Sequence, residues 1–138
     1  MVAVAGKLDL EQFQEQGYLV VKGLLDVEKD IQPLVEEYTT LLDSLAERWY
    51  QEGKLSSAYW GLPFSEKLVK IIGESGQAYY QHLDISLPQA NIKEDTPMHH
   101  GPAVFNLLTS PRLLDAVECF IGPEIYSNPV QHVRIKPP

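Results

Sequence analysis

One apolar stripe constrains the fold of this chain more than any other feature of its sequence. Between residues 31 and 49, large apolar side chains recur at intervals of three and four, the spacing of one face of an α-helix. Asp30 is a suitable cap, Pro33 fits the first turn and Gly53 follows the end. We therefore predict a long amphipathic helix whose buried face consists of Ile31, Leu34, Val35, Tyr38, Leu41, Leu42, Leu45 and Trp49.

Shorter helices are predicted on both sides of this stripe. Asp9 is expected to cap the first of them in a capping box with Gln12, and Gly17 to end it. Ser65 and the Ser110–Pro111 pair are the expected starts of two others. The remaining boundaries give helices over residues 9–17, 65 to 73 or 76, 77–84, 102–108 and 111–121, with the proline-containing residues 87–101 as a long loop.

Three short segments, residues 18–22, 124–126 and 130–136, have the composition of β-strands and are bounded by glycine or proline. So few strands form a marginal sheet, and an unpaired C-terminal strand edge is expected to favour self-association. With 138 residues, the chain is predicted to be a single α+β domain or part of one. Residues 1–122 would be mainly helical, with the strand near residues 18–22, and residues 123–138 would form strands.

Composition excludes several classes of function. Eleven Lys and Arg against nineteen Asp and Glu give a net charge of −8, which argues against binding to nucleic acid or to an anionic membrane. The single cysteine, Cys119, cannot form an internal disulfide, and its helical context indicates a buried core thiol. No apolar run approaches a membrane span, and the first residues lack the features of a signal peptide, so the cytoplasm is the expected compartment.

Few residues are candidates for metal chemistry. His82 and Asp84 would share one face of a strand, and His132 could complete a two-histidine, one-carboxylate iron site. In a helix, however, the first two side chains would diverge by about 200°. The helical or irregular interpretation is favoured, and this triad is kept as an alternative. The adjacent His99 and His100 are interpreted as a solvated surface pair.

A cationic face is predicted near the end of the chain. On a strand, His132, Arg134 and Lys136 would lie on one side and the intervening residues on the other. Such a face meets either solvent or an anion, and the absence of acidic residues after position 127 places an anion site at this end.

Three stretches together resemble the N-terminal part of the phytanoyl-CoA dioxygenase family of Fe(II)- and 2-oxoglutarate-dependent oxygenases. They are LEQFQEQGYLVV from Leu10, SPRLLDAVECFIGPEI from Ser110 and VQHVRIKPP from Val130. The resemblance implies a double-stranded β-helix (jelly-roll), of which this chain would supply a helical buttress and the first strands. It also implies that His132 lies beside 2-oxoglutarate; Arg134 and Lys136 are candidate contacts from the strand-face argument alone.

The family's iron-binding His-x-Asp follows its Lys-Pro-Pro segment, and its distal histidine comes later. This sequence stops at Pro138, before those positions. The expectation is therefore a hydroxylase portion that lacks the iron ligands, is inactive alone and binds neither Fe(II) nor 2-oxoglutarate tightly. The complete enzyme would act on a small-molecule substrate. The alternative is a stand-alone helical binding or interaction protein, derived from an oxygenase without its chemistry.

Overall fold

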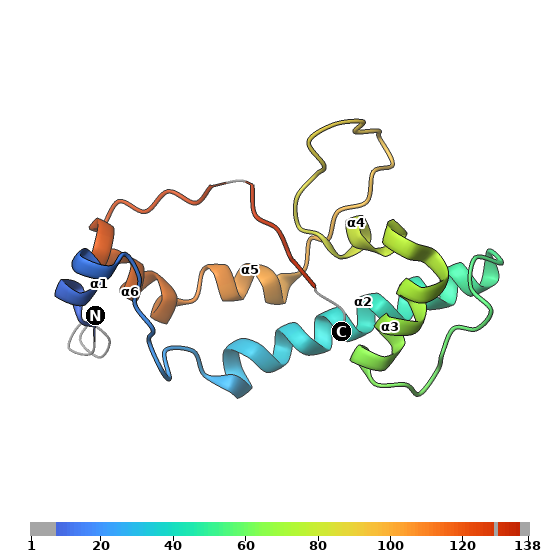
Figure 1. Cartoon of the computed structure of the whole chain (residues 1–138), viewed down its shortest axis with the longest axis horizontal. Coiled ribbons are helices and arrows are strands. Elements are labelled where there is room, and N and C mark those ends of the chain that lie inside the picture. Colours follow the sequence, from blue (N-terminus) through green and yellow to red (C-terminus); the bar gives the residue numbers. More distant parts are fainter. Residues whose placement is uncertain (1–7, 129, 136–138) are drawn as a thin grey trace. The chain divides into compact units, whose positions relative to one another are not determined.

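The computed structural model describes residues 8–128 and 130–135, which divide into two compact units. The first unit comprises the described residues of Met1–Leu34 and Pro102–Ser127, and the second those of Val35–Gly101 and Asn128–Pro138. The elements, shown in Figure 1, are α1 (Leu10–Gln16), the π-helical turn η2 (Val27–Ile31), α2 (Gln32–Gln51), α3 (Phe64–Ser75), the 3₁₀ turn η3 (Gly76–Tyr79), α4 (Tyr80–Leu83), α5 (Pro102–Leu108) and α6 (Pro111–Ile121).

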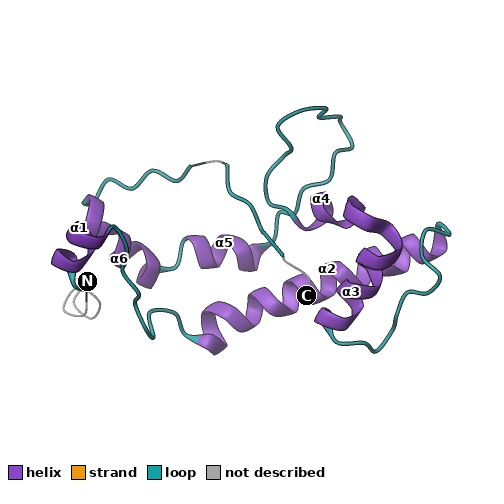
Figure 2. Cartoon of the chain, in the orientation of Figure 1, coloured by secondary structure: helices purple, strands orange, loops and turns teal. Residues whose placement is uncertain are grey.

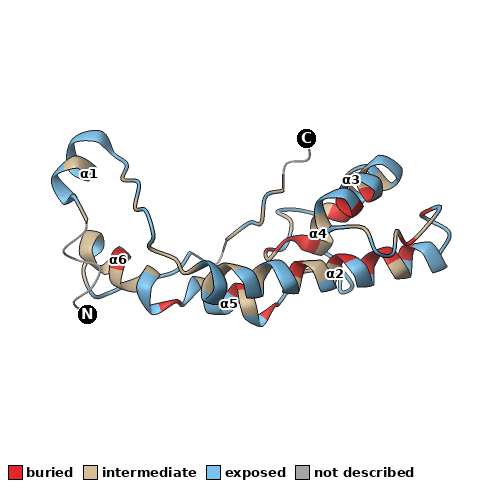
Figure 3. Cartoon of the chain, turned by 90° about the horizontal axis from the view of Figure 1, so that it is seen from below, coloured by how far each residue is buried: buried red, intermediate tan, exposed pale blue. Residues whose placement is uncertain are grey.

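The second unit holds most of the core. Its buried apolar residues come from α2, from the loop between α2 and α3, from α3, and from η3 and α4; Figure 3 colours the buried residues red. Burial of each large side chain contributes about 1.5–3 kcal/mol. Polar contacts add to this packing: the Tyr38 hydroxyl donates to the Leu83 carbonyl at 3.1 Å, and the buried Lys67 ammonium pairs with Asp43. The core residues are Tyr38, Leu42, Leu45, Ala46, Trp49, Leu55, Ala58, Leu68, Ile71, Tyr79 and Leu83.

The first unit has a much smaller core. Val104 and Ala116 are the only apolar side chains that are buried among its described residues. The rings of Phe13 in α1 and Phe120 in α6 meet edge to face, with centroids 4.7 Å apart. A unit of this size with so little buried apolar surface gains little stability from its own packing.

The predicted helices are confirmed except over residues 77–84, where a 3₁₀ turn precedes the short α4, and some of the starts differ. Asp9 caps α1 by accepting from the Gln12 amide at 2.8 Å, and Gly17 ends it in the left-handed conformation. The long helix is preceded by η2, whose cap is Asp26 rather than the predicted Asp30. Asp30 lies within this turn, and its carboxylate accepts from the Asp26 amide at 2.7 Å, which stabilises the start of the turn.

The α+β prediction is wrong: the structure has helices and loops and no β-strand among residues 8–128 and 130–135 (Figure 2). Residues 18–22 lie in a loop and turn, with Tyr18 59% and Val20 71% exposed. Residues 123–128 and 130–135 are also irregular, so no portion of a jelly-roll is present in the described part of the chain. A strand requires a neighbour to share its backbone hydrogen bonds, and none of these segments has one. Self-association stays a prediction, but without the sheet edge that suggested it.

Across the described part of the chain, no helix combines the length and the apolar character needed to cross a membrane.

Candidate functional site

A buried carboxylate anchors the C-terminal segment within the second unit. The Asp84 side chain is almost completely buried, and its Oδ2 lies 2.8 Å from His132 Nδ1. Its Oδ1 accepts the backbone amides of Val133 at 3.0 Å and of Ile85 at 2.9 Å. One carboxylate therefore binds both a side chain and a backbone amide of residues 130–135. These bonds hold the segment in place without the backbone hydrogen bonds of a β-sheet.

The end of α4 places Asp84 where it can do this. Asp84 terminates the helix, with its amide donating to the Tyr80 carbonyl at 3.1 Å and its backbone turning to an extended conformation. Its own carbonyl accepts the His99 amide at 2.8 Å, which fixes the far end of the long loop. Two residues later, Ser86 Oγ accepts the Gln131 amide at 2.9 Å and holds the same segment at a second point. Asp84 thus joins α4, the loop and the C-terminal segment.

The charges of this cluster follow from its hydrogen bonds. Burial acts to raise the pKa of Asp84, but its hydrogen bonds, that from His132 foremost, together outweigh burial and leave the pKa below its ordinary value. The carboxylate is therefore ionised at neutral pH and can only accept hydrogen bonds. His132 Nδ1 must then be the donor, so Nε2 is the ring nitrogen left for another group.

Arg134 lies against Tyr80, whose hydroxyl is close enough to both Asp84 and Arg134 for each of them to affect its pKa. Its guanidinium carbon is 5.4 Å from the centroid of the Tyr80 ring, a cation–π contact, and it makes no ion pair with any described carboxylate. The Tyr80 hydroxyl is buried and has no hydrogen-bond partner among the described residues. The structure thus brings two of the three predicted cationic residues, His132 and Arg134, to one cluster, and Lys136 lies outside the described residues.

The alternative iron triad does not assemble. His82 lies in α4, and its ring faces α2, where Nδ1 is 3.3 Å from an Arg48 guanidinium nitrogen, while Asp84 turns to His132. A guanidinium beside one ligand opposes a metal cation, and both oxygens of Asp84 already hold hydrogen bonds. No group of three potential metal ligands occurs among the residues that the structure describes, so these residues do not fit iron.

Of the other candidates, His99 and Cys119 make contacts within the protein, whereas His100 is on the surface. His99 is not a solvated surface residue, because its side chain is 12% exposed and Nε2 lies 2.8 Å from Glu37 Oε1. Its ring also meets Tyr38 edge to face at 5.1 Å. His100 is exposed, and Cys119 is half-buried with its thiol donating to the Asp115 carbonyl at 3.2 Å.

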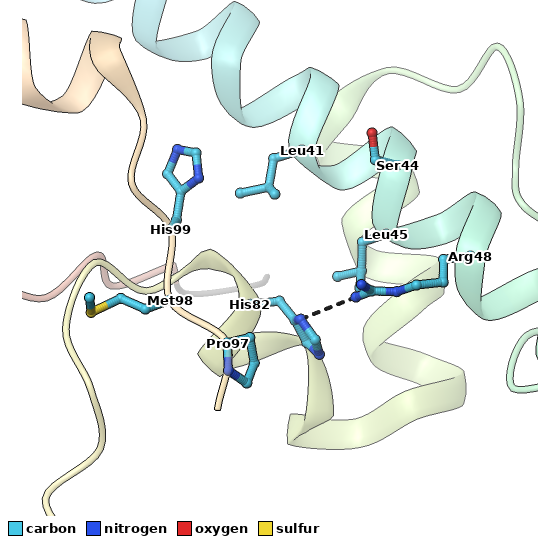
Figure 4. Close-up of a pocket in the computed structure, with 8 residues that line it drawn as sticks. All are labelled: Leu41, Ser44, Leu45, Arg48, His82, Pro97, Met98 and His99. Carbon is cyan, nitrogen blue, oxygen red and sulfur yellow. Dashed lines mark hydrogen bonds between the residues drawn. The ribbon is translucent and has the colours of Figure 1, made fainter. Parts of the chain in front are cut away.

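A cavity of about 210 Å³ opens on the other side of α4. Figure 4 shows its lining, with the Arg48 guanidinium directed at the ring of His82. The lining residues are Leu41, Ser44, Leu45, Arg48, His82, Pro97, Met98 and His99. Sequence reasoning missed Arg48, although a signal existed: residues 41, 44, 45 and 48 have the spacing of one helix face, and the last is charged.

Comparison with known proteins adds no family: no family model, no curated protein and no solved structure matches this chain. The resemblance to the phytanoyl-CoA dioxygenases therefore rests on its three sequence stretches alone.

Proposed function

We propose that this chain is part of a Fe(II)- and 2-oxoglutarate-dependent hydroxylase similar to the phytanoyl-CoA dioxygenases, and that His132 and Arg134 contact a carboxylate of 2-oxoglutarate. The observation that carries the proposal is the cluster at Asp84, which holds His132 by a 2.8 Å bond beside a guanidinium that has no carboxylate partner in the described chain. The order of the three sequence stretches supports the same assignment. None of the described residues is assigned to iron.

The chemistry of the two side chains suits this role. Arg134 presents a planar fork of N–H donors, which matches the shape of a carboxylate. Its contact with the Tyr80 ring already restricts the side chain, so less conformational entropy is lost when a ligand binds. Asp84 holds His132 through Nδ1 and so leaves Nε2 for the ligand. In the complete enzyme, 2-oxoglutarate would supply the two electrons that oxygen activation requires, and these residues would bind and orient it.

A titration of the ¹⁵N-labelled chain with 2-oxoglutarate tests this proposal. We expect saturable shifts of the Val133 and Arg134 amides, and Arg134→Gln should weaken binding by about tenfold, or about 1.4 kcal/mol. Arg112→Gln is the matched control, because Arg112 is a half-exposed arginine of the other unit. Unchanged affinity in Arg134→Gln, or no shift at these amides, would show that the cluster does not bind the co-substrate.

One observation favours a second candidate, a non-catalytic interaction protein that binds a second copy of itself. The first unit exposes several large apolar side chains, among them Phe105 at 66%, Ile121 at 61% and Tyr126 at 90%. A surface of this kind on a unit with a small core is a candidate interface. Light scattering across a concentration series distinguishes the candidates: a dimer that Phe105→Ser dissociates supports this one, and a monomer at all concentrations excludes it.

A further inference from the structure

The cavity between α2, α4 and residues 97–99 has one cationic wall. Arg48 reaches it from α2, and one of its guanidinium nitrogens lies 3.3 Å from His82 Nδ1. Two acids lie nearby. Glu47 accepts from Trp60 Nε1 at 2.9 Å and from Gln51 at 2.8 Å, and Glu52 lies 2.6 Å from Lys54. Glu52 is also close enough to Arg48 for their charges to interact, so Arg48 and Lys54 share one carboxylate and the three side chains keep a net positive charge.

His82 adds a neutral donor to the same wall. Burial first and the Arg48 guanidinium second lower the pKa of His82 below its ordinary value, so its ring is uncharged at pH 7. Because the guanidinium can only donate, His82 Nδ1 is the acceptor of their bond and Nε2 carries the proton. The pair thus places one full positive charge and one neutral imidazole on this wall of the cavity.

Apart from Ser44 and His99, the rest of the lining is apolar. Leu41 and Leu45 project from the same face of α2 as Arg48, and Pro97 and Met98 contribute to the lining from the loop (Figure 4). The volume of about 210 Å³ corresponds to about seven molecules of liquid water, which suits a small molecule.

A second charge sets the orientation of a ligand. His99 also lines the cavity, and its Nε2 is held by the Glu37 carboxylate at 2.8 Å. An anionic group would be repelled by Glu37 and attracted by Arg48. The charged end of a ligand therefore belongs near Arg48, and its apolar body belongs against Leu41 and Leu45.

We infer that this cavity binds a small monocarboxylate with an apolar body, with Arg48 as the residue that anchors the carboxylate. The site is separate from the cluster at His132 and Arg134, and the inference does not rest on the proposed hydroxylase function. An apolar floor with one convergent cationic group is the usual composition of a site for a small organic ligand.

Hexanoate is a suitable probe, with the His82 Cε1–H and Arg48 Nε–H signals of the labelled full chain as the readout. We expect saturable shifts at these two groups with a dissociation constant of about 1 mM. Hexanamide lacks the charge and acetate lacks the apolar body, so each should bind at least about tenfold more weakly. Arg48→Gln should also weaken hexanoate binding by about tenfold, whereas Arg134→Gln and Arg112→Gln should leave it unchanged.

Each contrary result has a definite meaning. Equal binding of hexanamide, or full affinity in Arg48→Gln, would show an apolar cavity without an anion site and overturn the inference. Inorganic phosphate binding as tightly as hexanoate would also overturn it, because the apolar lining would then contribute nothing. Arg48 is exposed, so the variant is expected to fold; a thermal melting curve that matches the Arg112→Gln control checks this.

Discussion

His132 Nδ1 lies 2.8 Å from Oδ2 of Asp84, a residue 48 positions earlier in the chain. Because Asp84 is buried and also accepts two backbone amides, this one contact fixes both the position of the C-terminal segment and the tautomer of the histidine. In a protein without described strands, an ionised side chain replaces a sheet as the attachment of an extended segment.

Asp84→Asn is expected to lower the free energy of unfolding at pH 7 by roughly 1.5–3 kcal/mol, the usual contribution of a hydrogen bond to a charged group. The asparagine keeps the shape of the side chain but removes the charge that His132 binds. Urea unfolding measures the effect, and Asp95→Asn in the exposed part of the loop is the control, with an expected change within about 0.5 kcal/mol. In a double-mutant cycle with His132→Ala, the coupling energy should account for most of this loss, because either variant alone removes the bond. Strictly additive effects of the two variants would refute the pairing.

The contribution of Asp84 to stability should depend on pH in a defined direction. Its folded pKa is below the unfolded value of about 3.9, so its stabilising effect is complete above that value and is lost as the pH falls through the folded pKa. The difference in unfolding free energy between the wild type and Asp84→Asn should therefore be constant near neutrality and shrink below about pH 4. Unfolding curves of both proteins between pH 3 and about pH 7 test this, and a difference that grows on acidification would contradict it.

Tyr38 is expected to titrate at unusually high pH. Burial, and then the nearby carboxylates of Glu37 and Asp84, raise its pKa to about 12. Since the folded value exceeds the unfolded value of about 10, its contribution is complete below pH 10 and is lost as the pH rises towards 12. Ultraviolet titration of the phenolates should show a transition near pH 12 that is lost in Tyr38→Phe. Burial also raises the pKa of Tyr80, and that tyrosine remains in the variant. If that variant retains the late transition, another residue is responsible.

Gly101→Ala should destabilise the second unit. A Cβ at this position would overlap the carboxylate of Glu37 and the ring of His99, so these two part-buried side chains would have to shift from their present positions. With a part-buried pair disrupted, we expect a loss of about 1–3 kcal/mol in the free energy of unfolding. Gly73→Ala is the matched control, because a Cβ there meets nothing within 4 Å and alanine favours the α3 helix by about 0.5–1 kcal/mol. Thermal unfolding should shift in opposite directions, and equal shifts would count against the overlap.

The sequence predicted the helices well because their signals are local. Asp9 and Gly17 bound α1 through contacts within a few residues. The predicted stripe identified the core face of α2 from Tyr38 to Trp49, but its first part was wrong: Ile31 and Leu34 are only partly buried and Val35 is 47% exposed. The same reasoning placed Asp30 at the cap of the long helix, because it could not foresee that a π-helical turn would extend the start back to Asp26.

Local signals could not decide whether the predicted strands form, because a β-strand exists only where a neighbouring segment shares its backbone hydrogen bonds. Tyr18 and Val20 have the composition of a strand, yet they lie exposed in a loop. At the other end, the backbone from Gln131 to Val133 finds its partners in the side chains of Ser86 and Asp84. Composition alone does not distinguish these outcomes.

The sequence by itself determined which segments are helical, which face of α2 is buried, and that His132 and Arg134 are candidates for binding an anion. Only the tertiary structure decided that Asp84 binds His132 and that His82 binds Arg48, although His82 and Asp84 are two residues apart. The physical reason is that helix propensity and amphipathicity act over a few residues, whereas a buried carboxylate or imidazole takes its partner from whichever distant segment folding brings to it.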